Sequence, residues 1–196
     1  MSAGDASLAR RRDNRPAPAA HPLPRVARLG NLDAGRARFE KSLALLGGQV
    51  LEPQAGESLS AAIARRFADA KIICSAVPDF EGTVRIEELG TPQKAAEVDV
   101  LVVRAPFGIA EMGSIFLSEA QLPTLNSAAH LTQHIVVILS EATLTANMHT
   151  AYIERPEFHT ARYGVLMSGP SATADIQGVL VRGAQGVRTL SVWWEP

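Results

Sequence analysis

Hydrophobic residues in the first half of the chain recur at the spacing of amphipathic helices. Phe39, Leu43 and Leu46 lie at positions i, i+4 and i+7, and Asp33 precedes them as the expected N-cap residue. The same periodicity returns over residues 58–70. Two amphipathic helices are therefore predicted, each with one apolar face for a core.

Short runs of hydrophobic and β-branched residues between the helices predict strands. The least interrupted runs are 71–76, 98–103 and 135–139, which are too short for buried helices. Continuous runs of this kind are typical of parallel strands that are covered on both faces. Because strands and helices alternate, right-handed βαβ crossovers are expected. The fold class is therefore α/β, with a mostly parallel sheet flanked by helices.

Weaker patterns predict the remaining elements. They are a helix starting at Thr91-Pro92, an extended segment over 109–117, a helix from Ser140 to Ile153, a strand over 165–167, one or two helical turns over 171–176, and a closing pair of strands over 179–182 and 189–194.

Composition narrows the class of protein. The chain has 196 residues, of which 46% are hydrophobic, and a formal net charge of −1. It contains no run of about 18 apolar residues, so we expect no membrane span. Near-neutral charge argues against a nucleic-acid-binding domain, which normally has a basic face. The single cysteine, Cys74, excludes an intramolecular disulfide and a cysteine-ligated cluster within the chain. We expect a cytoplasmic protein.

The near-neutral total hides a basic segment at the start. Residues 1–32 are rich in Pro, Arg and Ala, and the six arginines within 1–30 are opposed by Asp5 and Asp13 alone. Such a segment buries too little surface to fold, so a disordered arm is predicted, with the folded domain over 33–196. It lacks the apolar core of a secretory signal. A solvated tail is favoured over a transit peptide or a polyanion-binding arm.

Several familiar chemistries find little support in the sequence. His130 and His134 have the i, i+4 spacing of a metal pair, but His134 abuts a strand, so no metal site is expected. Cys74 lies in an apolar strand, where a thiol is inert. Dinucleotide-binding and P-loop fingerprints are absent. A triad of Ser168, His149 and Asp175 lacks the nucleophile-elbow motif.

Two stretches are better candidates for a site. Glu111 interrupts the apolar segment 109–117 and is followed by Gly113, which permits close approach of a ligand or of another backbone. The alternative is a glutamate on an edge strand facing water. In the second stretch, 167–178, Ser171 is expected to cap a short helix at the carboxyl edge of the sheet, where anionic ligands bind. The alternative is a well-capped helix with Asp175 bonded to nearby backbone.

These two stretches also carry a resemblance to a known family. Residues 168–181 (SGPSATADIQGVLV) strongly resemble the signature of the LUD domain, the lactate-utilisation family, in particular its lactate utilization protein C (LutC/YkgG) type. Residues 109–114 (IAEMGS), Leu122-Pro123 and 134–137 (HIVV) are similar to further family motifs in the same order, and the resemblance covers about 35–192.

The sequence departs from the family pattern at four positions. Met112 stands where threonine is usual, and Gln177 stands where glutamate is usual. In the last turn, Gln185 and Val187 replace the usual histidine and proline. This leaves a divergent role for that turn open.

The resemblance implies a fold similar to the NagB/RpiA/CoA-transferase group and membership of a three-component system that oxidises L-lactate to pyruvate. The iron–sulfur clusters are expected only in partner subunits, so this chain is expected to bind no cofactor and to act as an accessory subunit. A small anionic metabolite is the expected ligand, and a homodimer is possible.

The candidate site combines the motif residues with these expectations. Glu111 is expected to act as general base or ligand anchor, by weak analogy with the glutamate of related transferases, and Asp175 to fix the loop or meet a hydroxyl. The expected ligand-binding residues are Gly113, His134, Ser168, Gly169, Ser171 and Thr173. Two other classes of protein stay open: a free-standing enzyme or binding protein for a phosphorylated, folate or CoA-type ligand, and a non-catalytic module that docks onto iron–sulfur subunits.

Overall fold

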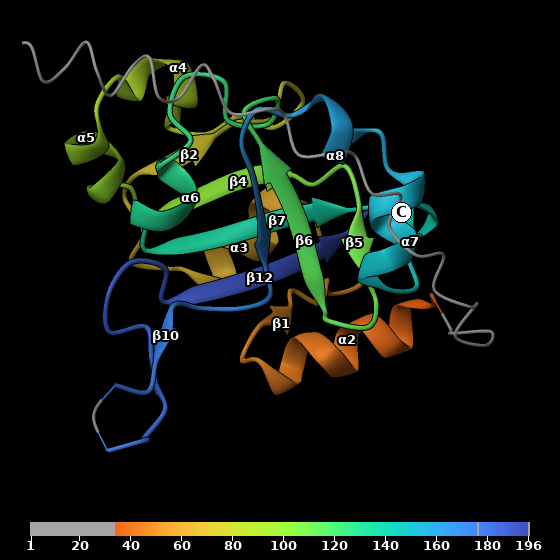
Figure 1. The fold of residues 1–196 in the computed structure, drawn as a ribbon. Coiled ribbons are helices and arrows are strands. Elements are labelled where there is room, and N and C mark those ends of the chain that lie inside the picture. The colour runs from red at the N-terminus through yellow and green to blue at the C-terminus, as the bar shows by residue number, and fades with distance from the viewer. Residues whose placement is uncertain (1–33, 176, 196) are drawn as a thin grey trace, which may run out of the picture. The chain divides into compact units, whose positions relative to one another are not determined.

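The computed structural model describes residues 34–175 and 177–195. The expected arm over 1–32 and the expected cap Asp33 lie outside these residues. Within them, a parallel sheet of six strands has the order β1-β12-β7-β4-β2-β3 (Figure 1). Its strands are β1 (Gln49–Val50), β2 (Ile73–Ser75), β3 (Val84–Arg85), β4 (Val100–Arg104), β7 (His134–Leu139) and β12 (Thr189–Trp194). The α/β class with a mostly parallel sheet is confirmed.

The centre of this sheet is built by strands that are buried on both sides. Residues 100–103 of β4 and 135–139 of β7 are buried. Alternate side chains of these strands face two different hydrophobic clusters. One cluster includes α3 (Leu59–Arg66), and the other includes α2 (Arg36–Leu45) and the short helices α4 (Ile86–Leu89), α5 (Pro92–Ala96) and α6 (Ala128–Leu131). The sheet therefore separates two cores, and the α3 face is distinct from the α2 face.

A second sheet packs on the α2 face. Its order is β8-β5-β6-β9, built from β5 (Gly108–Ile109), β6 (Ser114–Ser118), β8 (Leu144–Thr145) and β9 (Gly164–Met167). Ile115 and Leu117 of β6 join the core shared with the parallel sheet, whereas Phe116 faces the other way. There it packs in a cluster with α7 (Met148–Glu154) and α8 (Glu157–Thr160). Figure 1 shows β6 crossing in front of the parallel sheet.

Local capping follows the sequence at two helices. The Ser58 hydroxyl accepts a hydrogen bond from the Ala61 N–H at the start of α3, and Thr91 does the same for the Lys94 N–H at the start of α5. Both starts were predicted. The first helix also forms as predicted, with Phe39 and Leu43 buried, but it begins after Gly35 and leaves Leu46 47% exposed.

Four predicted elements differ in the structure. The segment 109–117 is a tight hairpin of β5 and β6, because residues 110–113 form a turn. The predicted helix from Ser140 splits into the 3₁₀ turn Glu141–Thr143, β8 and α7, and the side chain of Asn147 caps α7.

The other two differences lie near the C-terminus. Instead of helical turns over 171–176, β10 (Ala172–Thr173) pairs with β11 (Val181–Arg182) in an antiparallel ribbon. The predicted closing pair does not form, because β12 inserts between β1 and β7 and runs parallel to both.

The hairpin of β5 and β6 is fixed onto α2 by a glycine. Gly113 has φ +58, and a Cβ at this position would lie 2.1 Å from the Leu43 backbone nitrogen. The close approach that the sequence indicated at Gly113 is therefore an approach to another backbone.

His134 begins β7 on the α3 face of the sheet. Its ring centroid lies 4.8 Å from that of Phe67, and its Nδ1 lies 2.8 Å from the Thr189 hydroxyl of the adjacent strand β12. The side chain is half-buried between a helix and the start of the central strands. This placement gives the imidazole a packing role.

A Gly113→Ala substitution should destabilise the protein far more than Gly56→Ala. Both glycines have positive φ, so both alanines carry about the same backbone strain of ~1–2 kcal/mol. A Cβ at Gly56 meets nothing within 4 Å, whereas one at Gly113 collides with α2. We expect an additional loss of about 1–3 kcal/mol at Gly113, measured by urea unfolding. Equal losses would contradict the close packing of the hairpin on α2.

A His134→Gln substitution should weaken the dependence of stability on pH. Burial lowers the pKa of His134 below its ordinary 6.5, Arg188 and Arg66 lower it further, and Asp99 opposes them. The unfolded chain therefore takes up the proton first, and the free energy of unfolding falls as the pH drops through 6.5 towards the folded pKa. Urea unfolding at about pH 7, 6 and 5 measures this fall. The variant should lose less than the wild type, and an equal loss would refute the assignment.

Candidate ligand-binding cavity

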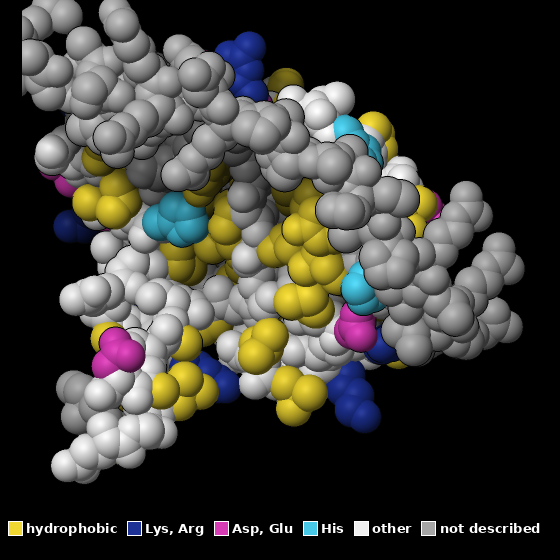
Figure 2. All heavy atoms as spheres, in the orientation of Figure 1, with side chains coloured by type: hydrophobic (Ala, Val, Ile, Leu, Met, Phe, Trp, Pro, Cys, Tyr) yellow, Lys and Arg dark blue, Asp and Glu magenta, His cyan; other side chains and the backbone are white. Residues whose placement is uncertain are grey.

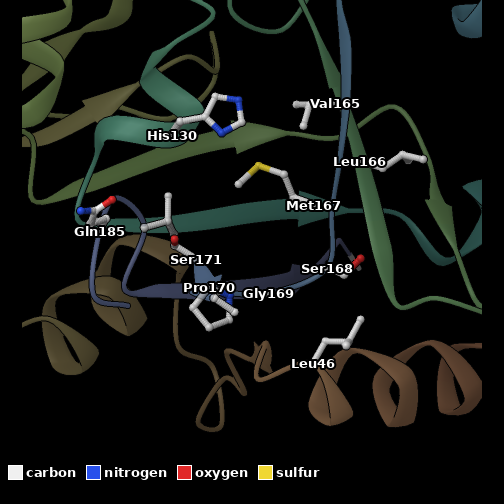
Figure 3. Close-up of a pocket in the computed structure, with 12 residues that line it drawn as sticks. Leu46, His130, Val165, Leu166, Met167, Ser168, Gly169, Pro170, Ser171 and Gln185 are labelled. Carbon is white, nitrogen blue, oxygen red and sulfur yellow. The ribbon is translucent and has the colours of Figure 1, made fainter. Parts of the chain in front are cut away.

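A cavity of about 400 Å³ lies beside the edge strand β9 on the α2 face of the sheet (Figure 3). The segments that surround it come from four parts of the chain: the end of α2, α6, β9 with the turn after it, and the turn before β12. Hydrophobic side chains gather in the middle of this face (Figure 2). The lining residues are Leu46, His130, Val165, Leu166, Met167, Ser168, Gly169, Pro170, Ser171, Ala172, Gln185 and Val187.

Backbone contacts fix the turn after β9 in place. A Cβ on Gly169 would lie 2.6 Å from the Leu46 carbonyl oxygen, so the turn runs directly against the chain that leaves α2. The Ser171 N–H donates to the Val187 carbonyl at 2.8 Å. The Ser168 hydroxyl is hydrogen-bonded to that of Ser114 on β6. The wall of the cavity is therefore tied to both sheets and to α2.

The cavity lies at the amino end of the parallel strands. Leu46 precedes β1, His130 precedes β7, and Val187 precedes β12. The sequence led us to expect a site at the carboxyl edge and at a helix N-terminus. Neither expectation holds, because β9 belongs to the second sheet and the segment after it forms the strand β10.

Three of the eight sequence-predicted site residues line the cavity together. They are Ser168, Gly169 and Ser171, all in the turn after β9. Thr173 and Asp175 are exposed on the ribbon of β10 and β11, where the Thr173 hydroxyl donates to the Asp175 carboxylate at 2.8 Å. The signature stretch therefore contributes its first half to the cavity and its second half to an exposed ribbon.

The other three predicted residues lie elsewhere. Glu111 is exposed in the turn between β5 and β6, and its N–H donates to the Ala146 carbonyl. The sequence suggested an extended apolar setting for this carboxylate, and the turn replaces it. Gly113 packs on α2, and His134 lies on the α3 face, across the sheet from the cavity.

Sequence reasoning missed two polar residues of the cavity, His130 and Gln185. The spacing of His130 and His134 favours a structural or ligand-contacting role over a metal pair, but the sequence does not place His130 in the site. The structure puts the two rings in different settings, one at the cavity and one against Phe67. Within the described residues, no group of three or more His, Cys, Asp or Glu side chains is arranged to hold a metal ion. The signal for Gln185 is its place in the last turn, where the sequence differs from the family pattern. This turn packs against α6.

Three further features bear on what the chain can do. A second cavity of about 530 Å³ lies beyond β2, lined by residues 78–85 and Glu88. Cys74 is buried, and this burial raises the pKa of its thiol to about 12, which disfavours the reactive thiolate. In the described part of the chain, no helix has the length and hydrophobicity for crossing a membrane.

Comparisons with known proteins agree with this architecture. The fold matches the crystal structure of a DUF162 family protein from Deinococcus radiodurans with a TM-score of 0.55 and 16% sequence identity. The match covers 81% of this chain and 94% of that one. No curated protein matches the sequence.

A family model describes most of the chain. The model of the LUD domain matches residues 58–192, a range that holds the parallel sheet except β1 and the last two residues of β12, together with the turn after β9. The chain therefore belongs to the LUD domain family.

Proposed function

We propose that the chain is a cluster-free component of a multi-subunit system that oxidises L-lactate to pyruvate, and that its cavity binds a small anionic metabolite. The observation that carries the proposal is the cavity beside β9. It is built on Ser168, Gly169 and Ser171, which begin the stretch most similar to the family signature, and none of its lining residues is Asp or Glu. A site without carboxylates favours an anion over a cation.

The cysteine content supports the proposed assignment of electron transfer to partner subunits. The chain has one cysteine, Cys74, and it lies in the core of the parallel sheet. Iron–sulfur clusters require several thiolate ligands. Electron transfer is therefore assigned to iron–sulfur partner subunits, and this chain is assigned the handling of the metabolite in the cytoplasm.

The volume of the cavity favours a second candidate as well. At about 400 Å³ it falls within the range of pockets for drug-sized ligands, whereas lactate has only three carbons. A binding protein or enzyme for a larger phosphorylated, folate or CoA-type anion would use this space. Thermal unfolding with L-lactate, pyruvate, a sugar phosphate, folate and coenzyme A separates the two, because only a ligand of the native state raises the Tm.

Deletion of the gene should abolish growth on L-lactate as the carbon source and leave growth on a sugar unchanged. The full chain expressed in trans should restore growth, and it should co-purify with a protein that contains iron and acid-labile sulfide. Normal growth of the deletion strain on L-lactate would refute the proposed function.

Cavity variants connect this phenotype to the site. Ser171→Leu should place an apolar side chain in the cavity, weaken binding of the metabolite at least about tenfold, which corresponds to about 1.4 kcal/mol, and slow growth on L-lactate. Ser60→Leu is the matched control, since Ser60 is exposed on α3. Glu111→Gln and Asp175→Asn test the two carboxylates predicted as catalytic. Normal growth with both would remove them from the site.

A further inference from the structure

We infer that His130 is the group that receives the anionic head of the ligand, with its proton held on Nδ1 by Tyr163. The ligand is an organic acid whose apolar end lies against Leu46 and Met167. The inference rests on the proposed function in one respect, namely that the cavity binds an anion. It goes beyond that function by naming the receiving atom and the shape of the ligand.

The backbone of His130 is held in place by close packing. His130 lies in α6, where its N–H donates to the Ser127 carbonyl at 2.9 Å. On the other side, Gly186 approaches so closely that a Cβ there would lie 2.5 Å from the His130 carbonyl oxygen. Gly186 also has φ +72, which favours glycine. The turn that contributes Gln185 to the cavity therefore packs directly on the residue that contributes the imidazole.

The ring of His130 is oriented by Tyr163. The tyrosine hydroxyl lies 2.9 Å from Nε2 of His130. Tyr163 is in turn fixed by Glu119, whose carboxylate accepts the N–H groups of Arg162 at 2.7 Å and Tyr163 at 3.1 Å. These backbone hydrogen bonds, with that of Arg162 the strongest contribution, lower the pKa of Glu119. The carboxylate is thus ionised at neutral pH and holds the tyrosine in position.

The direction of this contact decides which nitrogen carries the proton, and our inference assigns the Tyr163 hydroxyl as the donor. A neutral imidazole has one donor and one acceptor nitrogen, and the partner of one nitrogen sets the role of the other. When the Tyr163 hydroxyl donates to Nε2, the proton of His130 is on Nδ1. Figure 3 shows that one ring nitrogen of His130 faces the interior of the cavity. Nε2 of His130 is hydrogen-bonded to Tyr163, so the nitrogen that faces the cavity is Nδ1. This nitrogen therefore offers an N–H to a ligand.

The rest of the lining divides into a polar and an apolar end. Gln185 and Ser171 lie on the same side of the cavity as His130 (Figure 3). Toward the other side lie Leu46, 47% exposed, and Met167, whose sulfur extends between the two ends. The lining residues include no Asp or Glu, so no carboxylate opposes an anion beside the His130 N–H. An organic acid with an apolar chain fits this lining, because its carboxylate can lie at the polar end and its chain at the apolar end.

The first test measures the tautomer in the protein without ligand. Long-range ¹H–¹⁵N correlation spectra of the histidine side chains distinguish a protonated Nδ1 from a protonated Nε2. In the wild type, His130 is expected to have its proton on Nδ1. In Tyr163→Phe this preference should disappear. A proton on Nε2 in the wild type, or an unchanged tautomer in the variant, overturns the role of Tyr163.

The second test measures binding through the same Nδ1 signal. L-lactate and 2-hydroxyhexanoate are the probes, with inorganic phosphate as an anion without an apolar part. The longer acid should bind at least about tenfold more tightly than lactate, since its additional methylenes are buried. Equal affinities, or phosphate binding as tightly as the longer acid, overturn the apolar end. Absence of any shift at Nδ1 with either acid overturns the role of His130.

Two substitutions of His130 form a matched pair. Asparagine puts an N–H donor near the position of Nδ1, whereas glutamine reaches towards the position of Nε2 and Tyr163. His130→Asn should retain binding of 2-hydroxyhexanoate within about tenfold, and His130→Gln should weaken it by about tenfold or more. Because His130 is exposed and both replacements are polar, both variants should fold, and similar Tm values would show this. Equal binding by the two variants would contradict the assignment.

The outcomes separate this inference from the proposed function. If the deletion strain grows on L-lactate while His130 binds the longer acid through Nδ1, the proposed function fails and the inference stands. If growth is lost while His130 gives no response, the function stands and the inference fails.

Discussion

The insertion of the C-terminal strand into the middle of the parallel sheet is the constraint on which the rest of the structure depends. All six residues of β12 pair with the six residues of β7, and β1 pairs with the other side of β12. At its end, the Trp194 indole donates to the Glu40 carboxylate of α2 at 2.8 Å and packs edge-on against Phe39. The strand therefore joins the first helix and first strand to the remainder of the sheet.

This insertion also explains where the cavity forms. After β9 in the second sheet, the chain must return to the amino end of the parallel sheet before β12 can run between β1 and β7. The returning segment passes Leu46 and then approaches α6, where Gly169 and Gly186 allow contact with backbone carbonyls. The cavity is the space left between the edge of β9 and this returning segment. Its position follows from topology rather than from the carboxyl-edge rule that governs many α/β proteins.

The sequence predicts the central sheet well because burial dictates its composition. The runs 98–103 and 135–139 are apolar and β-branched since both faces are covered, and Ser58 and Thr91 are caps whose chemistry is local. By contrast, β5, β8, β10 and β11 each have two residues and are defined by their partners. No periodicity exists over so short a length, so the sequence predicts one extended segment over 109–117 and helical turns over 171–176.

The same distinction applies to the site. Ser168, Gly169 and Ser171 belong to a continuous stretch whose pattern is visible along the chain, and they line the cavity. His130 is distant in sequence from all of them and reaches the cavity because the 183–187 turn packs on α6. The residues around Glu111 and His134 predict a site, but both lie outside the cavity. The side of a sheet or of a turn on which a residue lies depends on tertiary packing, which the local sequence does not determine.

The position of β9 at the edge of its sheet has a consequence for solubility. An edge strand leaves backbone N–H and C=O groups unpaired along one side, and such an edge is a template for strands of other molecules. In this protein that side borders the cavity, and the ribbon of β10 and β11 that follows carries Val179, Leu180 and Val181 at the surface. A ligand in the cavity would therefore shield the edge, so that occupancy and resistance to aggregation rise together.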